Sequence, residues 1–149
     1  MLLSKILVLS DDIISLSISK TDCIFLYGEL GSGKTTFVRS LIHQLQKKNR
    51  IKKTEVLSPT FSLLHEYNIK NYKVMHYDLY RLKKSKDLEK LGIFKENDKV
   101  ITIIEWPEII KKTIANRLEI TFYHQEDQKS RKLRIKGFGK WKKFKLNAI

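Results

Sequence analysis

Residues 25–41, FLYGELGSGKTTFVRSL, decide the fold of this chain. Gly28, Gly33, Lys34 and Thr35 match the phosphate-loop pattern G-x-x-x-x-G-K-[ST]. In such a loop the backbone N–H groups surround phosphate oxygens, the lysine reaches the β- and γ-phosphates, and the hydroxyl binds Mg²⁺. Gly31 adds another residue without a Cβ, which lets the backbone turn tightly beside an anion. The stretch therefore predicts a nucleotide site.

The residues on either side supply the structural context that this motif needs. Residues 22–27, DCIFLY, form a short apolar run typical of a buried strand, and residues 36–48 carry apolar side chains at helical spacing. In a strand–loop–helix unit the helix N-terminus adds partial positive charge beside the phosphates. A glycine-rich turn that binds no ligand is the alternative, and the context favours phosphate binding.

Composition predicts one folded domain over residues 1–149, because 42% of the residues are apolar and the chain is long enough to bury a core. Lys and Arg number 30 against 16 Asp and Glu, which gives a net charge of +14. Such a charge favours anionic partners, nucleic acid first. A lysine-rich composition that keeps the protein soluble is an equal alternative.

The first residues, MLLSKILVLSDD, have no basic segment before the apolar run and end in two Asp. They predict a strand followed by a helix capped at Ser10 rather than a signal peptide. No apolar run approaches the length of a membrane span. We therefore expect a cytoplasmic protein without a membrane partner.

The remaining pattern predicts an α/β fold, a P-loop NTPase domain with a mixed β-sheet flanked by helices. Pro107 is placed to open a helix. The expected elements are a hairpin of residues 61–67 and 72–80, a helix between Ser85 and Gly92, a strand over residues 100–104, and strands over 117–123 and 131–137.

Two carboxylates are candidates for the chemistry. Glu105 directly follows the apolar run VITII, at the sheet edge where ligands bind in open α/β folds, so we expect it to act on Mg²⁺. Asp78, in MHYDLYRL, is placed to orient the attacking water or to contact Mg²⁺. Simple solvent exposure is an equal alternative for Asp78. His76 is expected to be a packed or hydrogen-bonded structural residue.

Other side chains have weaker signals. Thr60 lies in SPTF, residues 58–61, a loop expected after a short strand, where contact with a γ-phosphate or Mg²⁺ would order it. The residues alone favour a capping hydroxyl in a turn. Trp106 is either a core residue or an aromatic residue that faces a partner. Cys23 is expected to be a buried structural thiol.

The segment after Asp127 contains no acidic residue and reads KSRKLRIKGFGKWKKFKLNAI from Lys129. Aromatic side chains interleaved with Lys and Arg suit nucleic-acid stacking and phosphate contact. A solvated strand followed by a loose end is an equal alternative.

Four motifs stand in order along the chain, GELGSGKTTF, SPTFSLLHEY, HYDLYRL and IIEWPE. Together they resemble the TsaE (YjeE) family of small bacterial P-loop ATPases, over nearly the whole chain. The resemblance implies an Mg²⁺-dependent ATPase required for threonylcarbamoyladenosine at position 37 of tRNA. It further implies weak activity alone, stimulation by the partner proteins TsaB and TsaD, and no threonylcarbamoyl transfer by this chain itself.

The resemblance also assigns roles to individual residues. ATP and Mg²⁺ are the implied cofactors, with catalytic roles for Lys34, Asp78 and Glu105 and metal binding by Thr35 and Glu105. No adenine contact is predicted, because residues 11–13 offer no counterpart to a nucleotide-binding Thr of the family. The implied cofactor-binding residues are Gly31, Ser32, Gly33, Lys34, Thr35, Thr36, Thr60 and Trp106.

Two other functions use the same loop. A small-molecule kinase needs an acceptor pocket and a lid, usually rich in Arg, and the residues after the first helix instead have strand patterns. A nucleotide-regulated RNA-binding module is favoured by the basic C-terminal segment, which makes tRNA a candidate partner. A guanine-specific switch is disfavoured, because the sequence has no N-K-x-D segment.

Overall fold

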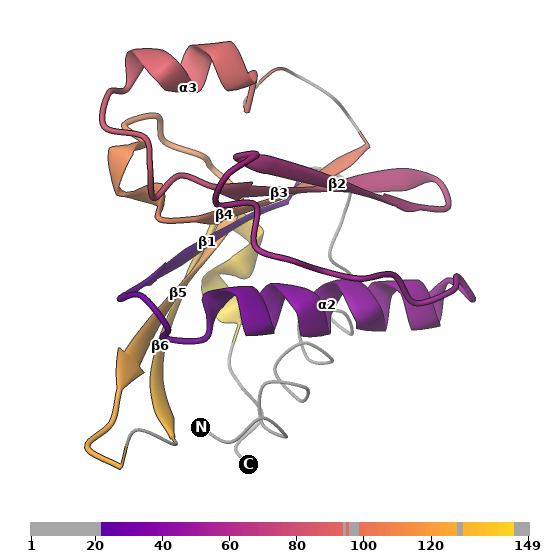
Figure 1. Ribbon diagram of the computed structural model, residues 1–149, viewed down its shortest axis with the longest axis horizontal. Coiled ribbons are helices and arrows are strands. Elements are labelled where there is room, and N and C mark those ends of the chain that lie inside the picture. The colour runs from indigo at the N-terminus through magenta and orange to yellow at the C-terminus, as the bar shows by residue number, and fades with distance from the viewer. Residues whose placement is uncertain (1–21, 94, 96–98, 128–129, 145–149) are drawn as a thin grey trace.

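A mixed β-sheet forms the centre of the structure (Figure 1). This computed structural model describes residues 22–93, 95, 99–127 and 130–144, so the strand and helix predicted around Ser10 lie outside the described residues. In chain order the elements are β1 (Cys23–Gly28), α2 (Lys34–Lys48), β2 (Leu64–Ile69), β3 (Tyr72–Asp78), α3 (Lys86–Leu91), β4 (Val100–Glu105), the 3-10 helix η1 (Pro107–Ile109), β5 (Arg117–His124), β6 (Arg131–Phe138) and the 3-10 helix η2 (Gly139–Lys143).

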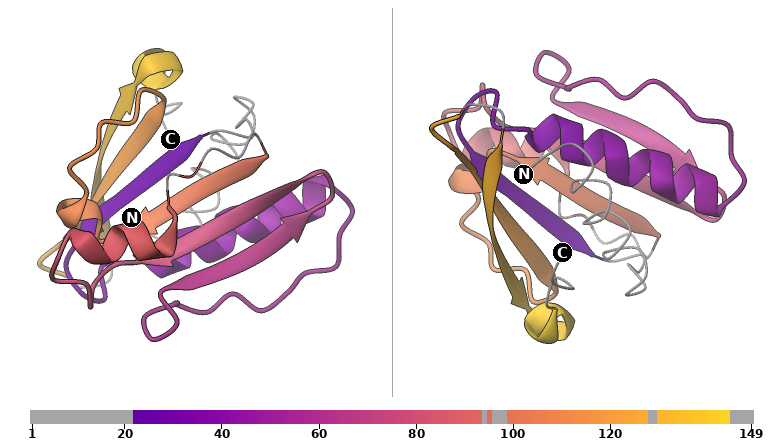
Figure 2. Two further views of the ribbon diagram at one scale, coloured as in Figure 1. Left: turned by 90° about the horizontal axis from the view of Figure 1, so that it is seen from above. Right: turned by 90° about the horizontal axis from the view of Figure 1, so that it is seen from below.

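The strands of the described chain are ordered β2-β3-β4-β1-β5-β6. The four central strands run parallel, whereas β2 and β6 pair antiparallel at the two edges, which lie on opposite sides of the molecule in Figure 2. The α/β fold with a mixed sheet, predicted from the sequence, is confirmed. No helix in this part of the chain is both long and apolar enough to cross a membrane.

Helix α2 covers one face of the sheet, and α3 and η1 lie on the other (Figure 1). The apolar side chains of α2 recur at helical spacing, and Phe37, Leu41 and Leu45 are at most 1% exposed. Burial of each such side chain contributes about 1.5–3 kcal/mol. Because successive strand residues point to opposite faces, Leu26 and Ile103 pack in the cluster with α2, whereas Phe25 and Ile104 belong to the other cluster.

Several boundaries differ from the sequence prediction. The first hairpin strand begins at Leu64 rather than at residue 61, because residues 60–62 form a turn and the Leu63 N–H donates to the Pro59 carbonyl over 2.6 Å. Ser85 precedes α3, but its side chain makes no capping hydrogen bond. The helix expected from Pro107 is one 3-10 turn, whose Ile110 N–H donates to the Pro107 carbonyl.

The short strand expected before residues 58–61 is wrong. Residues 51–57 contain no strand, and side chains of α2 satisfy their backbone groups instead. Arg39 Nε donates to the Val56 carbonyl over 3.0 Å, and the Gln46 side chain bonds both the Thr54 N–H and its hydroxyl. The segment therefore runs along α2 rather than in the sheet.

The basic C-terminal segment folds back onto the core. A Cβ at Gly137 would collide with the Trp141 carbonyl, so glycine permits η2 to turn against β6. Trp141 is 3% exposed, and its Nε1 donates to Asp22 over 3.4 Å, while Lys140 forms a 2.6 Å ion pair with the same carboxylate. Nucleic-acid stacking, which the sequence allowed for the aromatic residues of this segment, is therefore excluded for Trp141.

Candidate nucleotide-binding site

The site begins with the order of the parallel strands. β1 lies beside β4, which lies beside β3, so the residues that end these strands meet at one edge of the sheet. Asp78 and Glu105 are direct register partners there. His76 and Asp78 share the strand face of Val74, and Glu105 shares the face of Ile103, which is the face packed against α2. Strand alternation therefore directs these polar side chains toward the start of α2.

The phosphate loop joins β1 to that helix. Gly28 has a φ of +136° and Gly33 a φ of +107°, values that other residues rarely adopt, and a Cβ at Gly28 would lie 2.6 Å from the Phe122 carbonyl. No side chain caps the N-terminus of α2, and its first turn holds no acidic residue. The unpaired N–H groups and the helix dipole thus favour an anion at this point.

Lys34 is held inside the loop at 4% exposure. Its ammonium donates to the Gly28 carbonyl over 2.6 Å and to the Glu29 carbonyl over 2.9 Å. Burial lowers the pKa of Lys34, and the negative charge of Glu105 is the largest of the carboxylate effects that oppose this shift. The lysine therefore places a cation at the phosphate loop.

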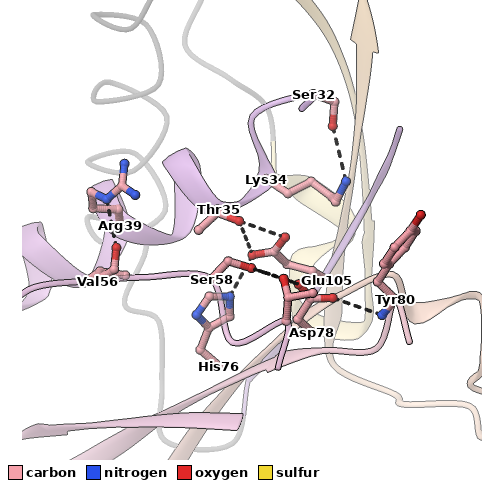
Figure 3. A network of polar contacts seen from close by, with 11 residues as sticks. Ser32, Lys34, Thr35, Arg39, Val56, Ser58, His76, Asp78, Tyr80 and Glu105 are labelled. Atoms are coloured by element: carbon pink, nitrogen blue, oxygen red, sulfur yellow. Dashed lines mark hydrogen bonds and ion pairs between the residues drawn. The ribbon is translucent and has the colours of Figure 1, made fainter. Parts of the chain in front are cut away.

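Thr35 and Glu105 contact each other directly across the site (Figure 3). The Thr35 hydroxyl lies 2.9 and 3.1 Å from the two carboxylate oxygens of Glu105, which is 2% exposed. His76 Nε2 lies 2.8 Å from Glu105 Oε1 and, against an ionised carboxylate, acts as the donor. The histidine is fully buried, so its predicted structural place is confirmed. It fixes the Glu105 carboxylate toward Thr35.

Asp78 binds the loop that follows α2, and at 3% exposure it is not the solvent-facing residue that the sequence left open. Its Oδ2 accepts from the Ser58 hydroxyl over 3.0 Å and from the Thr60 hydroxyl over 2.8 Å. Its Oδ1 accepts from the Tyr80 N–H over 3.0 Å. Asp78 therefore ties residues 58–60 to the end of β3 at the site (Figure 3).

Trp106 forms a wall beside the lysine. Its backbone has a φ of +59° and a ψ of +54°, a conformation that costs a non-glycine residue about 1–3 kcal/mol. The ring centroid lies 4.0 Å from Lys34 Nζ and 4.8 Å from the Tyr80 ring centroid. The strained backbone thus holds the indole at the phosphate loop.

These side chains enclose a cavity of about 190 Å³. Pockets for whole small molecules typically measure about 300–1,000 Å³, so the cavity is smaller than these and has the size of a site for part of a ligand. Amide and ammonium groups donate to phosphate oxygens, and hydroxyl and carboxylate oxygens are the ligands that Mg²⁺ prefers. The residues present therefore fit both a phosphate chain and Mg²⁺. Every residue that the sequence predicted for the site lines this cavity: Gly31, Ser32, Gly33, Lys34, Thr35, Thr36, Thr60, Asp78, Glu105 and Trp106.

Comparison with known proteins agrees with this geometry. The family model described as threonylcarbamoyl adenosine biosynthesis protein TsaE matches residues 6–133. The chain belongs to the TsaE family. The resemblance drawn from the four sequence motifs is thereby confirmed.

Two TsaE relatives carry the name tRNA threonylcarbamoyladenosine biosynthesis protein TsaE. The Rickettsia felis protein is 39% identical over 99 residues, which are 66% of this chain and 56% of that protein. The chain thus spans little more than half the length of that relative. The Aquifex aeolicus protein is 38% identical over 116 residues, 77% of each chain. The crystal structure of Bacillus subtilis YdiB shares the fold, with a TM-score of 0.68 and 22% identity over 94% of this chain and 83% of that one.

Sequence patterns missed the contacts that Arg131 and His124 make with the TsaE-family phosphate loop. Arg131, at the start of β6, donates through Nε to the Ser32 carbonyl over 3.1 Å and through Nη2 to the Gly31 carbonyl over 3.3 Å. His124, at the end of β5, lies 3.3 Å from the Leu30 carbonyl. The β5–β6 hairpin therefore supports the outer side of the loop. Only the pairing of β5 with β1 brings it there, and no local motif signals that pairing.

Proposed function

We propose that this TsaE-family chain binds and hydrolyses ATP with Mg²⁺ in the formation of threonylcarbamoyladenosine at position 37 of tRNA. In this proposal it works in the cytoplasm with TsaB and TsaD and does not itself transfer the threonylcarbamoyl group. The contact between Thr35 and Glu105 carries the proposal, because it joins a phosphate-loop hydroxyl to a carboxylate at the end of the neighbouring strand. The names of the relatives support the pathway.

In the proposed mechanism each group has one task. The loop amides and the N-terminus of α2 bind phosphate oxygens, and Lys34 neutralises charge on the β- and γ-phosphates. Thr35 and Glu105 would hold Mg²⁺, which would neutralise negative charge on the phosphate oxygens. His76 keeps the Glu105 carboxylate turned toward Thr35.

Asp78 acts on hydrolysis through the loop of residues 58–60. Its contacts with the Ser58 and Thr60 hydroxyls hold that loop at the cavity, where these oxygens and the carboxylate can orient the attacking water. The Ser58 or Thr60 hydroxyl can bind a phosphate oxygen only after it releases its hydrogen bond to Asp78. Closure of this loop over a nucleotide therefore depends on these contacts.

Phosphate release from γ-labelled ATP tests the proposal directly. We expect slow release by the purified chain and faster release after addition of TsaB and TsaD, with the label recovered as inorganic phosphate. Lys34→Ala is the control for contaminating activity. Absence of stimulation by matched partners would refute the partnership, and label recovered in an acceptor molecule would indicate the small-molecule kinase instead.

A further inference from the structure

Within the part of the chain that the structure describes, the β5–β6 hairpin presents one face to the core and leaves the other open. Leu118, Ile120 and Phe122 point into the cluster with α2 and are at most 1% exposed. On the opposite face, the apolar cluster around α3 and η1 takes no residue from β5 or β6 within the described chain. Strand register aligns on that open face Arg117 with Phe138, Glu119 with Lys136, Thr121 with Arg134, and Tyr123 with Lys132.

The open face carries a row of cations. Lys132, Arg134 and Lys136 are exposed and alternate along β6, which spaces their Cα atoms about 7 Å apart. Among the described residues none of the three forms an ion pair with an acidic side chain. Glu119, the acidic residue in this register, is paired with Arg117 over 2.8 Å. The row therefore attracts anions.

A hollow of about 330 Å³ lies beside this row, lined by Tyr27, Glu119, Thr121, Arg134 and Lys136. Burial, with smaller effects from Glu119 and Glu108, raises the pKa of Tyr27 to about 12, so its phenol keeps its proton at neutral pH and can donate. Tyr123, from the same strand face as Thr121, is 42% exposed. The face thus combines cations, hydroxyl groups and aromatic rings.

We propose that this open face of Tyr27, Thr121, Tyr123, Lys132, Arg134 and Lys136, the hairpin face, binds a single-stranded loop of tRNA. The spaced cations meet successive phosphates, and the exposed ring of Tyr123 takes an unstacked base, as aromatic residues on the sheets of RNA-binding modules do. An acidic protein would use the cations but would have no need of an exposed aromatic platform. The choice of tRNA rests on the proposed function, whereas RNA binding by this face does not require ATP hydrolysis.

The charge test uses fluorescence anisotropy of a fluorescein-labelled tRNA transcript with the full chain. The test variant is Lys132→Glu/Arg134→Glu/Lys136→Glu. The control, Lys48→Glu/Lys52→Glu/Lys53→Glu, makes the same charge change at exposed positions at and after the end of α2, on the other side of the sheet. We expect the test variant to lose at least tenfold in affinity for the transcript. The slope of the logarithm of affinity against the logarithm of salt concentration should be smaller in magnitude by about 2, since each single-strand phosphate contact contributes about 0.7. The affinity of the control variant should stay within about twofold of the wild-type value, because its substituted lysines lie away from the proposed RNA contacts.

The stacking test compares Tyr123→Phe, which keeps the ring, with Tyr123→Ala, which removes it. We expect wild-type affinity for the first and at least a fivefold loss for the second, with thermal melts and ATP hydrolysis unchanged in all hairpin-face variants. The proposal would be overturned if the two charge variants lost tRNA affinity equally, or if neither lost any. Competition by polyglutamate as strong as by oligouridine, with Tyr123→Ala at wild-type affinity, would assign the face to an acidic protein instead. Loss of RNA binding with intact ATP hydrolysis separates this proposal from the proposed function.

Discussion

Replacement of Glu105 by Gln removes one negative charge from the proposed Mg²⁺ site and leaves its shape unchanged. The amide oxygen can still accept from the Thr35 hydroxyl, which lies 2.9 Å from Oε1 in the present contact. The change therefore isolates the charge of the carboxylate from its packing. We expect a higher Mg²⁺ requirement with little change in metal-free nucleotide binding.

The size of the effect follows from the burial of this carboxylate. Two unit charges about 4 Å apart interact by about 4 kcal/mol at an effective dielectric constant of 20. Glu105 is only 2% exposed, so solvent screens it weakly, but relaxation of the surrounding groups reduces the interaction. A loss of about 2 kcal/mol corresponds to a Mg²⁺ midpoint raised about 30-fold.

The assay is a calorimetric titration of ATP at a series of Mg²⁺ concentrations. Glu66→Gln is the matched control, because Glu66 is an exposed carboxylate on β2 that pairs with Lys73 over 3.1 Å, in the same hairpin as Asp78. The control should leave the Mg²⁺ midpoint unchanged. An unchanged midpoint in a folded Glu105→Gln protein would refute the assignment of Glu105 to the metal.

Three further experiments test other parts of the structure. Asp78→Asn weakens charge-assisted bonds to residues 58–60, so we expect kcat in the partner-stimulated assay to fall at least tenfold while ATP affinity stays within a few-fold; a shifted Mg²⁺ midpoint with unchanged kcat would contradict this role. Arg131→Ala frees the Gly31 and Ser32 carbonyls and should weaken ATP binding by about tenfold in calorimetry, with Arg131→Lys intermediate because it retains the charge without the fork; equal affinities for all three proteins would remove Arg131 from the loop support. Burial raises the pKa of the Cys23 thiol, so it should react with a chromogenic disulfide reagent only as fast as the chain unfolds, and rapid reaction of the native protein would contradict its burial.

The sequence predicted much of the site because its signals are local. A strand run before GELGSGKT and a helical period after it define the phosphate loop, and Glu105 follows directly on a second apolar run. Since parallel strands end at one sheet edge, these two segments had to meet if β1 and β4 were neighbours, as they are. Alternation along β3 likewise places Asp78 on the same face as His76.

Other features depend on contacts between distant segments. Arg131 reaches the phosphate loop only because β5 pairs with β1 and β6 with β5. Trp141 stands among lysines in the sequence, and only the turn of η2 against β6 buries it. The segment before Ser58 contains β-branched residues, but its backbone groups bond side chains of α2 rather than a neighbouring strand. Local patterns carry none of this information.

Calorimetric titration of Mg²⁺-ATP into the wild-type chain and into Lys34→Ala tests the central claim most directly. Lys34 is held by the Gly28 and Glu29 carbonyls at the cavity that all the predicted residues line. The variant loses both the fixed cation and its charge-assisted hydrogen bond to the phosphates. Because a hydrogen bond to a charged group contributes up to about 3 kcal/mol, we expect Mg²⁺-ATP binding to weaken at least 100-fold. Binding by the wild-type chain that is lost in the variant is the predicted result. Equal affinity of the two proteins for Mg²⁺-ATP would contradict the assignment of this loop as the nucleotide site.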